Sequence, residues 1–400
     1  MTTLRVVAKR LVTCPTDPKD GLGVRHDAIV DVDGSAIERV IPAGLAPPFT
    51  GRTVQADLVT PGLCDAHTHA AWAGSRHSEY VMRMAGADYE EIAKAGGGIV
   101  ESMRAVKRVT LEELTDVIAK RVLRMASLGV TTVEVKSGYG LDFEGELKQL
   151  LAIERAHRMV GPVTIVPTFL ALHALPPEAQ GDRSAYAARV AGETYNALRD
   201  RGLFRFVDAY LDRGAFLPEH ADALCRRAKE DDVGVRLHVG QFADVGGAAF
   251  AARVGAASID HAEHIDDADL DKLAAAGVRA TLLPVASFTL RGPSPNIEGM
   301  RRAGVRMVVA SDANPGTAPT ESLPLALAMG IRAYGLTVSE ALRGATVEAA
   351  ASLCLPDRGR IQEGCRADLA CWDLAHEDAL SQPFGAKKTT YVIAGGEVLS

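Results

Sequence analysis

Four residues of this chain have the types and spacing to hold one divalent cation. His67 and His69 follow an apolar run, and His238 and Asp312 stand far downstream. On a β-strand, side chains at positions i and i+2 point to the same side, so the first two histidines can reach one ion. Three imidazoles and one carboxylate suit Zn²⁺, with iron as the alternative, and leave a position for water. The pattern predicts a hydrolase that uses a metal-activated water.

Further polar residues near these ligands are suited to proton transfer. Asp312 is expected to take a proton from the activated water and to pass it to the leaving nitrogen, as general base and then acid. We expect His261 to orient the water or polarise a carbonyl group, and His264 to support the metal ligands. Hydrogen-bonded structural histidines are the alternative, because a lone HxH pair is weak evidence. No lysine ends the fourth predicted strand, so we expect one metal ion rather than two.

Strand-like segments carry these residues near their carboxyl ends. The segments cover residues 58–69, 130–137, 163–173, 204–212, 234–241, 257–264, 279–287 and 305–312. Helical stretches separate them, and their apolar runs lack alternation, as is typical of parallel strands buried on both faces. The repeated strand and helix, and the count of eight strands, predict an α/β fold of the (β/α)8 TIM-like barrel type. Such barrels place catalytic side chains at the carboxyl ends of their strands.

The two ends of the chain differ from its middle. Both are rich in short β-like stretches and turns, and neither has enough apolar surface to form a core alone. We therefore predict one composite β-sandwich domain from residues 1–57 and 355–400. Residues 58–354 would form the barrel, and 400 residues suffice for both domains.

Composition limits the classes of partner. The net charge of -7 is mild and no basic stripe is present, so we expect a small-molecule substrate rather than nucleic acid or an anionic membrane. No apolar run resembles a signal peptide or approaches the length of about 20 residues that spans a bilayer. The six cysteines lack CxxC spacing, which predicts reduced, buried thiols in a cytoplasmic protein.

Longer motifs give the chain a resemblance to a known family. The motifs are GVTTVEVKSGYGL at 129–141, TFLALHALP at 168–176, DHAEH at 260–264 and SDANPGTAPT at 311–320. SGYGL and DANPGT are far more specific than HxH, which a whole superfamily shares. Over nearly the whole barrel the chain resembles the imidazolonepropionases of the amidohydrolase superfamily, which are ring-opening hydrolases of histidine metabolism.

The resemblance implies a role for each residue that matches a family position. The matches to metal ligands are His67, His69, His238 and Asp312. The matches to residues that hold the substrate's propionate are Arg76, Tyr89 and Tyr139, and those that face the imidazolone ring are His173 and Gln241. The matches to a loop that contacts substrate or product are Asn314, Gly316 and Thr317. Arginine offers a planar fork for a carboxylate, and phenol hydroxyls can complete its hydrogen bonds.

Several of these residues have a simpler interpretation beside the functional one. Arg76 is suited to the surface as well as to a carboxylate. Tyr139 can pack in a turn between two glycines, and Tyr89 can pack on an amphipathic helix.

Gln241 bears on the reaction type. Deaminases of the superfamily carry a glutamate three residues beyond the fifth-strand histidine, because ammonia release requires a carboxylate that shuttles protons. The amide of Gln241 can hydrogen-bond but cannot shuttle protons, which favours ring opening. The resemblance then implies hydrolysis of 4-imidazolone-5-propanoate to N-formimidoyl-L-glutamate, by a homodimer. The alternatives are a related mononuclear cyclic-amide hydrolase or aminohydrolase for another small carboxylated heterocycle, or a metal-free scaffold.

Two positions depart from the family pattern. The fourth predicted strand ends in Leu211-Asp212, where a Cys-Glu pair is usual, and His238 is followed by Val239-Gly240, where Ala-Asp is common. Neither pair matches a metal ligand. Both pairs lie at the expected barrel mouth, so they bear on which substrate binds rather than on the type of reaction.

Overall fold

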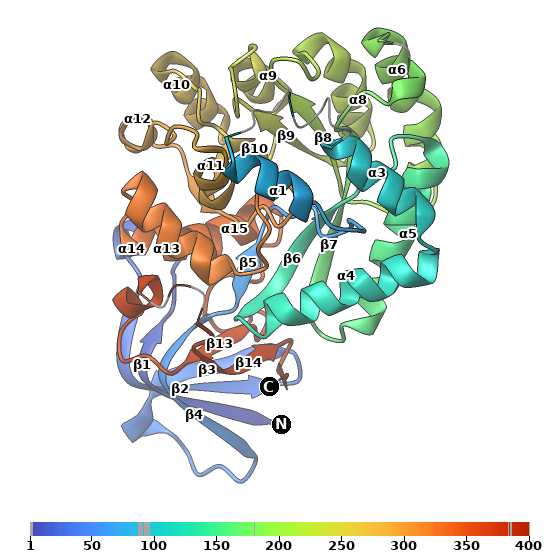
Figure 1. Ribbon diagram of the computed structural model, residues 1–400. Helices are drawn as coiled ribbons and strands as arrows, with labels where there is room; N and C mark the ends of the chain where they lie inside the picture. The colour runs from blue at the N-terminus through green and yellow to red at the C-terminus, as the bar shows by residue number, and fades with distance from the viewer. Residues whose placement is uncertain are drawn as a thin grey trace.

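The structure is a computed structural model that describes residues 3–86, 91, 97–179, 181–382, 384 and 386–399. It consists of an eight-stranded parallel barrel and a separate seven-stranded sheet. In Figure 1 the sheet lies below the barrel, and the two ends of the chain lie beside it. The predicted α/β barrel with a composite terminal domain is confirmed.

The barrel wall follows the order of the strands in the sequence. Its strands are β5 (Leu63–Asp65), β6 (Val130–Lys136), β7 (Thr164–Leu172), β8 (Phe206–Leu211), β9 (Gly234–Val239), β10 (Ser258–His261), β11 (Arg279–Leu282) and β12 (Met307–Val309). The segments after β5 and β12 meet through main-chain hydrogen bonds. His69 N donates to Ala313 O (3.0 Å), and Asp312 N donates to His67 O (3.1 Å). This closure brings predicted metal ligands from the two ends of the barrel together.

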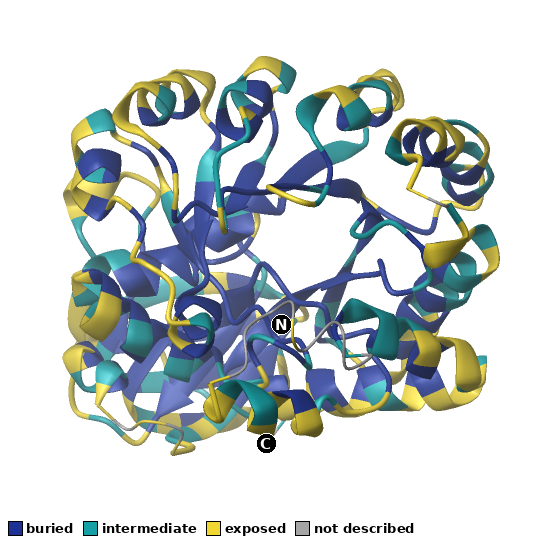
Figure 2. Ribbon diagram, turned by 45° about the horizontal axis from the view of Figure 1, so that its top comes forward, coloured by how far each residue is buried: buried dark blue, intermediate teal, exposed yellow. Residues whose placement is uncertain are grey.

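Helices surround the barrel. They are α1 (His77–Met84), α3 (Ile99–Arg108), α4 (Leu111–Ala126), α5 (Phe143–Met159), α6 (Arg183–Arg189), α7 (Tyr195–Arg199), α8 (Pro218–Glu230), α9 (Gly247–Val254), α10 (Asp267–Ala276), α11 (Pro284–Leu290), α12 (Ile297–Ala303), α13 (Leu323–Tyr334), α14 (Val338–Gly344) and α15 (Val347–Ser352). Between α6 and α7 the chain forms a π-helical turn, η4 (Val190–Thr194). Figure 2 shows buried strands at the centre and exposed residues on the outer faces of the helices.

Helix α4 illustrates why these segments become helices. Thr110 and Glu113 form a capping box that satisfies main-chain groups at its first turn. Leu114, Ile118 and Val122 recur at helical spacing and are fully buried against the barrel. Burial of each such side chain contributes about 1.5–3 kcal/mol. The helix is therefore fixed by its cap and by one apolar face.

The second sheet joins both ends of the chain. Its order is β15 (Glu397–Val398), β14 (Thr389–Ala394), β13 (Leu369–Trp372), β4 (Arg52–Pro61), β1 (Leu4–Val12), β2 (Val24–Asp33) and β3 (Ala36–Pro42). The C-terminal β13 pairs antiparallel with the N-terminal β4. Buried side chains such as Val6, Val30 and Ile393 form one apolar core within this sheet. Hydrogen bonding keeps β4 in this sheet as far as Pro61, while the domain limits at 57 and 355 stay predictions.

The first predicted strand, 58–69, is wrong as a single strand. The chain divides it at Gly62, so that β4 belongs to the second sheet and β5 to the barrel. Gly62 lets the chain pass close to β6 at this point, because a Cβ atom there would lie 2.3 Å from Thr131 Oγ1. Predicted strands also extended too far at their carboxyl ends. For example, β11 ends at Leu282 because Pro284 begins helix α11.

Two smaller predictions can be compared with the structure. Among the helices that the structure describes, none is long and apolar enough to cross a bilayer. All six cysteines carry free thiols, as expected. The expectation that all are buried is wrong for Cys354, which is exposed just beyond α15.

Candidate metal and active site

Four side chains converge at the carboxyl ends of β5, β9 and β12. The Nε2 atom of His69 lies 3.3 Å from Nε2 of His67 and 3.3 Å from Nε2 of His238. The Oδ1 atom of Asp312 lies 3.4 Å from Nε2 of His67 and 3.5 Å from Nε2 of His69. All four residues are buried. The structure thus brings together the complete set of predicted metal ligands.

The cluster fits a metal ion. A tetrahedral site with metal–nitrogen bonds of about 2.0–2.1 Å has ligand atoms roughly 3.3–3.4 Å apart, and the observed separations of 3.3–3.5 Å agree. Asp312 Oδ1 is buried without a hydrogen-bond partner in the part of the chain that the structure describes. A buried carboxylate oxygen in this state is costly unless a cation compensates it. The donor atoms therefore form a site for a divalent metal.

Two buried carboxylates orient the metal-binding histidines. Asp260 Oδ2 lies 2.7 Å from Nδ1 of His67, and Asp208 Oδ1 lies 3.1 Å from Nδ1 of His238. Because a carboxylate accepts a hydrogen bond, each histidine carries a proton on Nδ1, and Nε2 is the nitrogen left to bind a metal in the cluster.

Lys136 links the two carboxylates beneath the metal cluster. Its Nζ atom donates to Asp208 (2.8 Å) and to Glu134 (2.9 Å), and it lies 3.6 Å from Asp260. Arg236 donates to Asp260 from the other side (3.2 Å). All these side chains are fully buried inside the barrel, so their charges must balance one another.

The electrostatics favour a cation at this position. Burial lowers the pKa of His69, and the neighbouring imidazoles lower it further, so that its nitrogen remains available as a ligand. Burial and Lys136 lower the pKa of His67, but contacts with Asp260 and Asp312 outweigh them and raise it to about 9. Burial raises the pKa of Asp312, yet the nearby histidines outweigh burial and leave it lowered. Groups that stabilise a proton among these ligands also stabilise a divalent cation.

Backbone strain accumulates around the cluster. His261 has φ of 90°, Ala262 has 68° and Asp312 has 54°, although none of them is glycine. Such conformations cost about 1–3 kcal/mol each and are frequent at active sites. The turn after β10 places the ring of His261 5.6 Å from that of His238. His261 therefore lies beside the metal cluster, and its predicted role stays a prediction.

The same turn makes the prediction for His264 wrong. His264 was expected to support the metal ligands, but its side chain is exposed. The positive φ angles at His261 and Ala262 redirect the chain, and His264 contributes its backbone N–H to Gly240 O (2.9 Å).

His173 and Tyr139 form one side of the site. The ring of His173 stacks on His69 with centroids 5.2 Å apart, and the ring of Tyr139 lies 5.4 Å from His173. Burial and the nearby His238 lower the pKa of His173 to about 3, so its ring is neutral. Burial raises the pKa of the Tyr139 hydroxyl, and the positive charge of Arg76 offsets part of that rise.

Arg76 already has an internal carboxylate partner. Its Nε and Nη2 atoms donate to Glu79 at 2.9 and 2.6 Å, and Glu79 also accepts from Gly98 N at 2.9 Å. Glu79 occupies one edge of the guanidinium and leaves the Nη1–Nη2 edge for a second carboxylate. The guanidinium rests against Gly316, where a Cβ atom would lie 2.2 Å from Arg76 Nη1.

Asn314 builds the loop after β12. Its Oδ1 atom accepts from Gly316 N (2.8 Å) and Thr317 N (2.7 Å), and its Nδ2 atom donates to Asp312 O (2.7 Å). The amide of Asn314 is thus engaged within the loop and shapes it. The loop joins a metal ligand, Asp312, to the glycine that packs against Arg76.

Gln241 and Asp212 lie at the mouth between β8 and β9. The Tyr210 hydroxyl donates to Gln241 Oε1 (2.8 Å), which holds the amide at the mouth. Asp212, the departure from the family pattern, accepts from Phe242 N (2.9 Å) and Ala243 N (3.0 Å). Its carboxylate therefore anchors the loop that carries Gln241.

Tyr89 lies outside the described residues. Every other predicted site residue is described and lies at the carboxyl end of the barrel, from Arg76 after β5 to Thr317 after β12.

Sequence reasoning missed the residues that support the site. They are Lys136, Glu134, Asp208, Asp260, Arg236 and Glu79. A signal was available for two of them, because Glu134 and Lys136 are charged residues that stand two positions apart in β6. Side chains two positions apart share one face of a strand, which here is the barrel interior.

Known proteins resemble the chain in sequence. The family model described as Amidohydrolase family matches residues 81–399. An imidazolonepropionase of Sphingopyxis alaskensis is 45% identical over 359 residues, which cover 89% of this chain and 88% of that protein. An imidazolonepropionase of Paracoccus denitrificans is 43% identical over 363 residues, which cover 90% of each.

Solved structures resemble it in fold. A triazine hydrolase variant superposes with a TM-score of 0.77 at 20% identity, over 99% of this chain and 94% of that one. A guanine deaminase of C. acetobutylicum superposes with a TM-score of 0.76 at 14% identity, over 99% of both chains. The fold is that of the amidohydrolases, and by its sequence the chain belongs to the imidazolonepropionase family.

Proposed function

We propose that the protein hydrolyses the cyclic amide of 4-imidazolone-5-propanoate to N-formimidoyl-L-glutamate, a ring-opening step of histidine degradation. One observation carries the proposal. The loop after β12 has a metal ligand, Asp312, at one end and at the other Gly316, against which the guanidinium of Arg76 packs. A small ring with a carboxylate arm fits these two partners at once.

The side chains around the cluster have distinct tasks in this reaction. A bound divalent ion would supply an activated water for attack on the ring carbonyl. Asp312 accepts the proton of that water and passes it to the ring nitrogen as the C–N bond breaks. His261 lies beside the cluster and orients the carbonyl, and His173 and Gln241 hydrogen-bond to the ring. Arg76, with Tyr139 nearby, holds the propionate.

We further propose Zn²⁺ as the ion, with iron as the alternative. Three imidazole nitrogens and one carboxylate oxygen form a ligand set that zinc accepts. An adenosine deaminase of Xanthomonas campestris, which has a TM-score of 0.73 to this chain, was solved with bound zinc. A homodimer in the cytoplasm belongs to the same proposal, by similarity to the family, and sedimentation analysis tests the dimer.

A turnover assay tests the proposed function. Freshly generated imidazolonepropionate is added to protein of known metal content, and its ultraviolet absorbance and the ammonia released are followed. Loss of absorbance without ammonia, with one N-formimidoyl-L-glutamate formed per substrate, is expected. Ammonia release, or no turnover by fully metal-loaded protein, would contradict the proposal.

The change Gly316→Ala is expected to weaken substrate binding without unfolding the protein. The new Cβ atom would lie 2.2 Å from Arg76 Nη1 and push the guanidinium away. The colliding atom is the end of a flexible side chain, so the fold can adjust at little cost. A charge-assisted hydrogen bond is worth about 1.5–3 kcal/mol, so KM should rise about 10- to 100-fold. Steady-state kinetics and thermal melting measure the two effects.

Two further variants calibrate this result. Arg76→Ala should raise KM at least as much and leave metal content intact. Gly44→Ala adds a methyl group where no atom lies within 4 Å, and should change nothing. If Gly316→Ala and Arg76→Ala impair an uncharged substrate analogue equally, the proposed role of Arg76 as carboxylate partner is wrong.

The change Gln241→Glu is not expected to create a deaminase. A carboxylate at this position could shuttle protons, but Tyr139 and Arg76 would still select a carboxylated ring. Loss of one hydrogen bond to the ring, worth about 1.5 kcal/mol, should lower kcat/KM about tenfold. Ammonia release, followed by a coupled assay with imidazolonepropionate and with guanine, should stay at background. Strong ammonia release from either compound would undermine this account of selectivity.

A further inference from the structure

The loop Gly138–Leu141 between β6 and α5 carries two contacts of the site. Tyr139 lies beside the metal cluster, and the carbonyl oxygen of Gly138 lies 2.8 Å from Nδ1 of His173. Leu141 in this loop is strained, because it has φ of 59° although it is not glycine. Such a conformation persists only when the surrounding structure holds it.

Side chains from the first turns of α5 accept hydrogen bonds from all four N–H groups of this loop. Glu146 Oε2 accepts from Gly138 N (2.9 Å), and Oε1 accepts from Gly140 N (2.8 Å) and Leu141 N (2.8 Å). Gln149 Oε1 accepts from Tyr139 N (2.9 Å). Glu146 is 3% exposed and makes no ion pair within the described chain. Its charge is therefore balanced by backbone dipoles of the loop.

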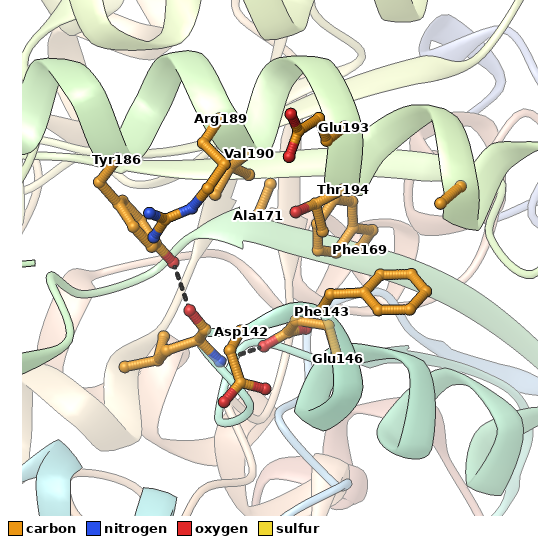
Figure 3. A pocket seen from close by; sticks show the side chains of 12 residues that line it. Asp142, Phe143, Glu146, Phe169, Ala171, Tyr186, Arg189, Val190, Glu193 and Thr194 are labelled. Atoms are coloured by element: carbon orange, nitrogen blue, oxygen red, sulfur yellow. Dashed lines mark hydrogen bonds between the residues drawn. The ribbon is translucent and has the colours of Figure 1, made fainter. Parts of the chain in front are cut away.

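On its outer side, the loop Gly138–Leu141 is not held by packing alone. A cavity of about 420 Å³ lies there, lined by residues of α5, β7 and the π-helical turn η4. Figure 3 shows Glu146 and Tyr186 in the wall of this cavity. The Tyr186 hydroxyl donates to Leu141 O (3.1 Å). Because the cavity leaves room for the loop to shift, hydrogen bonds must define its position.

The carbonyl of Gly138 determines the tautomer of His173. A carbonyl oxygen can only accept a hydrogen bond, so Nδ1 of the neutral ring must carry the hydrogen. The Nε2 atom then carries a lone pair and can accept a hydrogen bond from a ring N–H of the substrate. If the carbonyl moved, the other tautomer would present a donor at Nε2 instead.

We propose that Glu146 is a positioning residue, which acts through the Gly138 carbonyl to hold His173 in its Nδ1–H tautomer. The catalytic consequence rests on the proposed function, whereas the tautomer itself does not. A carboxylate is required because both of its oxygens accept hydrogen bonds. A glutamine would place an NH2 group against one set of backbone donors.

The test begins with the wild-type protein. In the zinc-loaded form, ¹⁵N-edited NMR of the histidine rings should show His173 protonated at Nδ1, with assignment by comparison with His173→Gln. Protonation at Nε2 in the wild type would overturn the proposal, whatever the substrate is. This measurement does not depend on the folding of any Glu146 variant.

The isosteric change Glu146→Gln tests the positioning role itself. Both tautomers of His173 should become populated, and kcat/KM should fall about 10- to 100-fold, the usual effect of losing a supporting contact. Metal content should remain at the wild-type value. Glu144→Gln changes an exposed carboxylate in the same helical turn and should leave both measurements unchanged.

A double-mutant cycle shows whether Glu146 acts through His173. In a His173→Ala background, Glu146→Gln should lower kcat/KM by far less than in the wild type. The reason is that both changes remove the same contribution, which is that of the His173 ring. Full additivity, or an unchanged single tautomer in Glu146→Gln, would overturn the proposal. If imidazolonepropionate proves not to be the substrate, the kinetic measurements no longer test the proposal. The NMR comparison of the wild type with Glu146→Gln then decides whether Glu146 holds the tautomer of His173.

Discussion

The change His69→Ala is expected to remove the metal from the protein. The Nε2 atom of His69 lies within 3.5 Å of the ligand atoms of His67, His238 and Asp312, so every other ligand adjoins it. Loss of a residue that merely supports a metal ligand costs about 10- to 100-fold in affinity, so loss of this ligand should cost more than about 100-fold. Metal quantification after dialysis should find far less than one equivalent, and turnover should fall in proportion.

An exposed histidine provides the control. His26 lies on β2 in the second sheet, and His26→Ala should retain both metal and turnover. A full equivalent of metal in His69→Ala, held as tightly as in the wild type, would refute the assignment of the site. Added zinc should restore little activity to the variant, because the missing nitrogen cannot be replaced by excess metal.

The change Lys136→Met is expected to destabilise the fold by about 3–5 kcal/mol, the cost of removing one partner from a buried ion cluster. The ammonium of Lys136 lies 2.8 Å from Asp208 and 2.9 Å from Glu134, and both carboxylates are fully buried. Methionine has a similar length and fills the space. The loss of stability therefore measures the effect of removing the charge rather than a change in side-chain volume. Urea unfolding of the metal-loaded protein measures the difference.

The pH dependence of this loss has a defined sign. Burial raises the pKa of Asp208, but His238 and Lys136 outweigh it and leave it lowered, so its charge stabilises the folded state above its unfolded pKa. Without Lys136 the folded-state pKa rises, and the penalty is largest at high pH. The deficit should therefore be greater at pH about 8 than at pH about 5, since protonation relieves the unpaired charge. Lys120→Met, an exposed change on α4, should cost little at either pH.

The four residues of the candidate metal cluster could be found in the sequence because strand geometry is local. An extended segment alternates its faces every residue, and Thr68 still bridges to Ala313 beyond β5, so His67 and His69 point the same way. Parallel strands of a barrel end at one mouth, so residues at the ends of distant strands had to meet there. No contact between particular side chains was needed for that prediction, and it was confirmed for His238 and Asp312.

The predictions that were wrong depended on backbone turns. His264 follows the strand end by three residues, but positive φ at His261 and Ala262 turns its side chain outward. The strand-like segment 58–69 is continuous in sequence, yet hydrogen-bond pairing assigns its two halves to different sheets. Hydrophobicity indicates that a strand is buried but not which sheet buries it.

The sequence by itself determined the fold class, the number of barrel strands and the residues that meet at the metal. These follow from short-range periodicity and from motifs that lie within single segments. Only the tertiary structure decided how charge is balanced around them, with Lys136 between Asp208 and Glu134, and Glu79 on one edge of Arg76. The reason is physical: a buried charge is stable only beside a specific partner. That partner lies on another strand or helix, and its distance in space cannot be derived from the spacing of residues along the sequence.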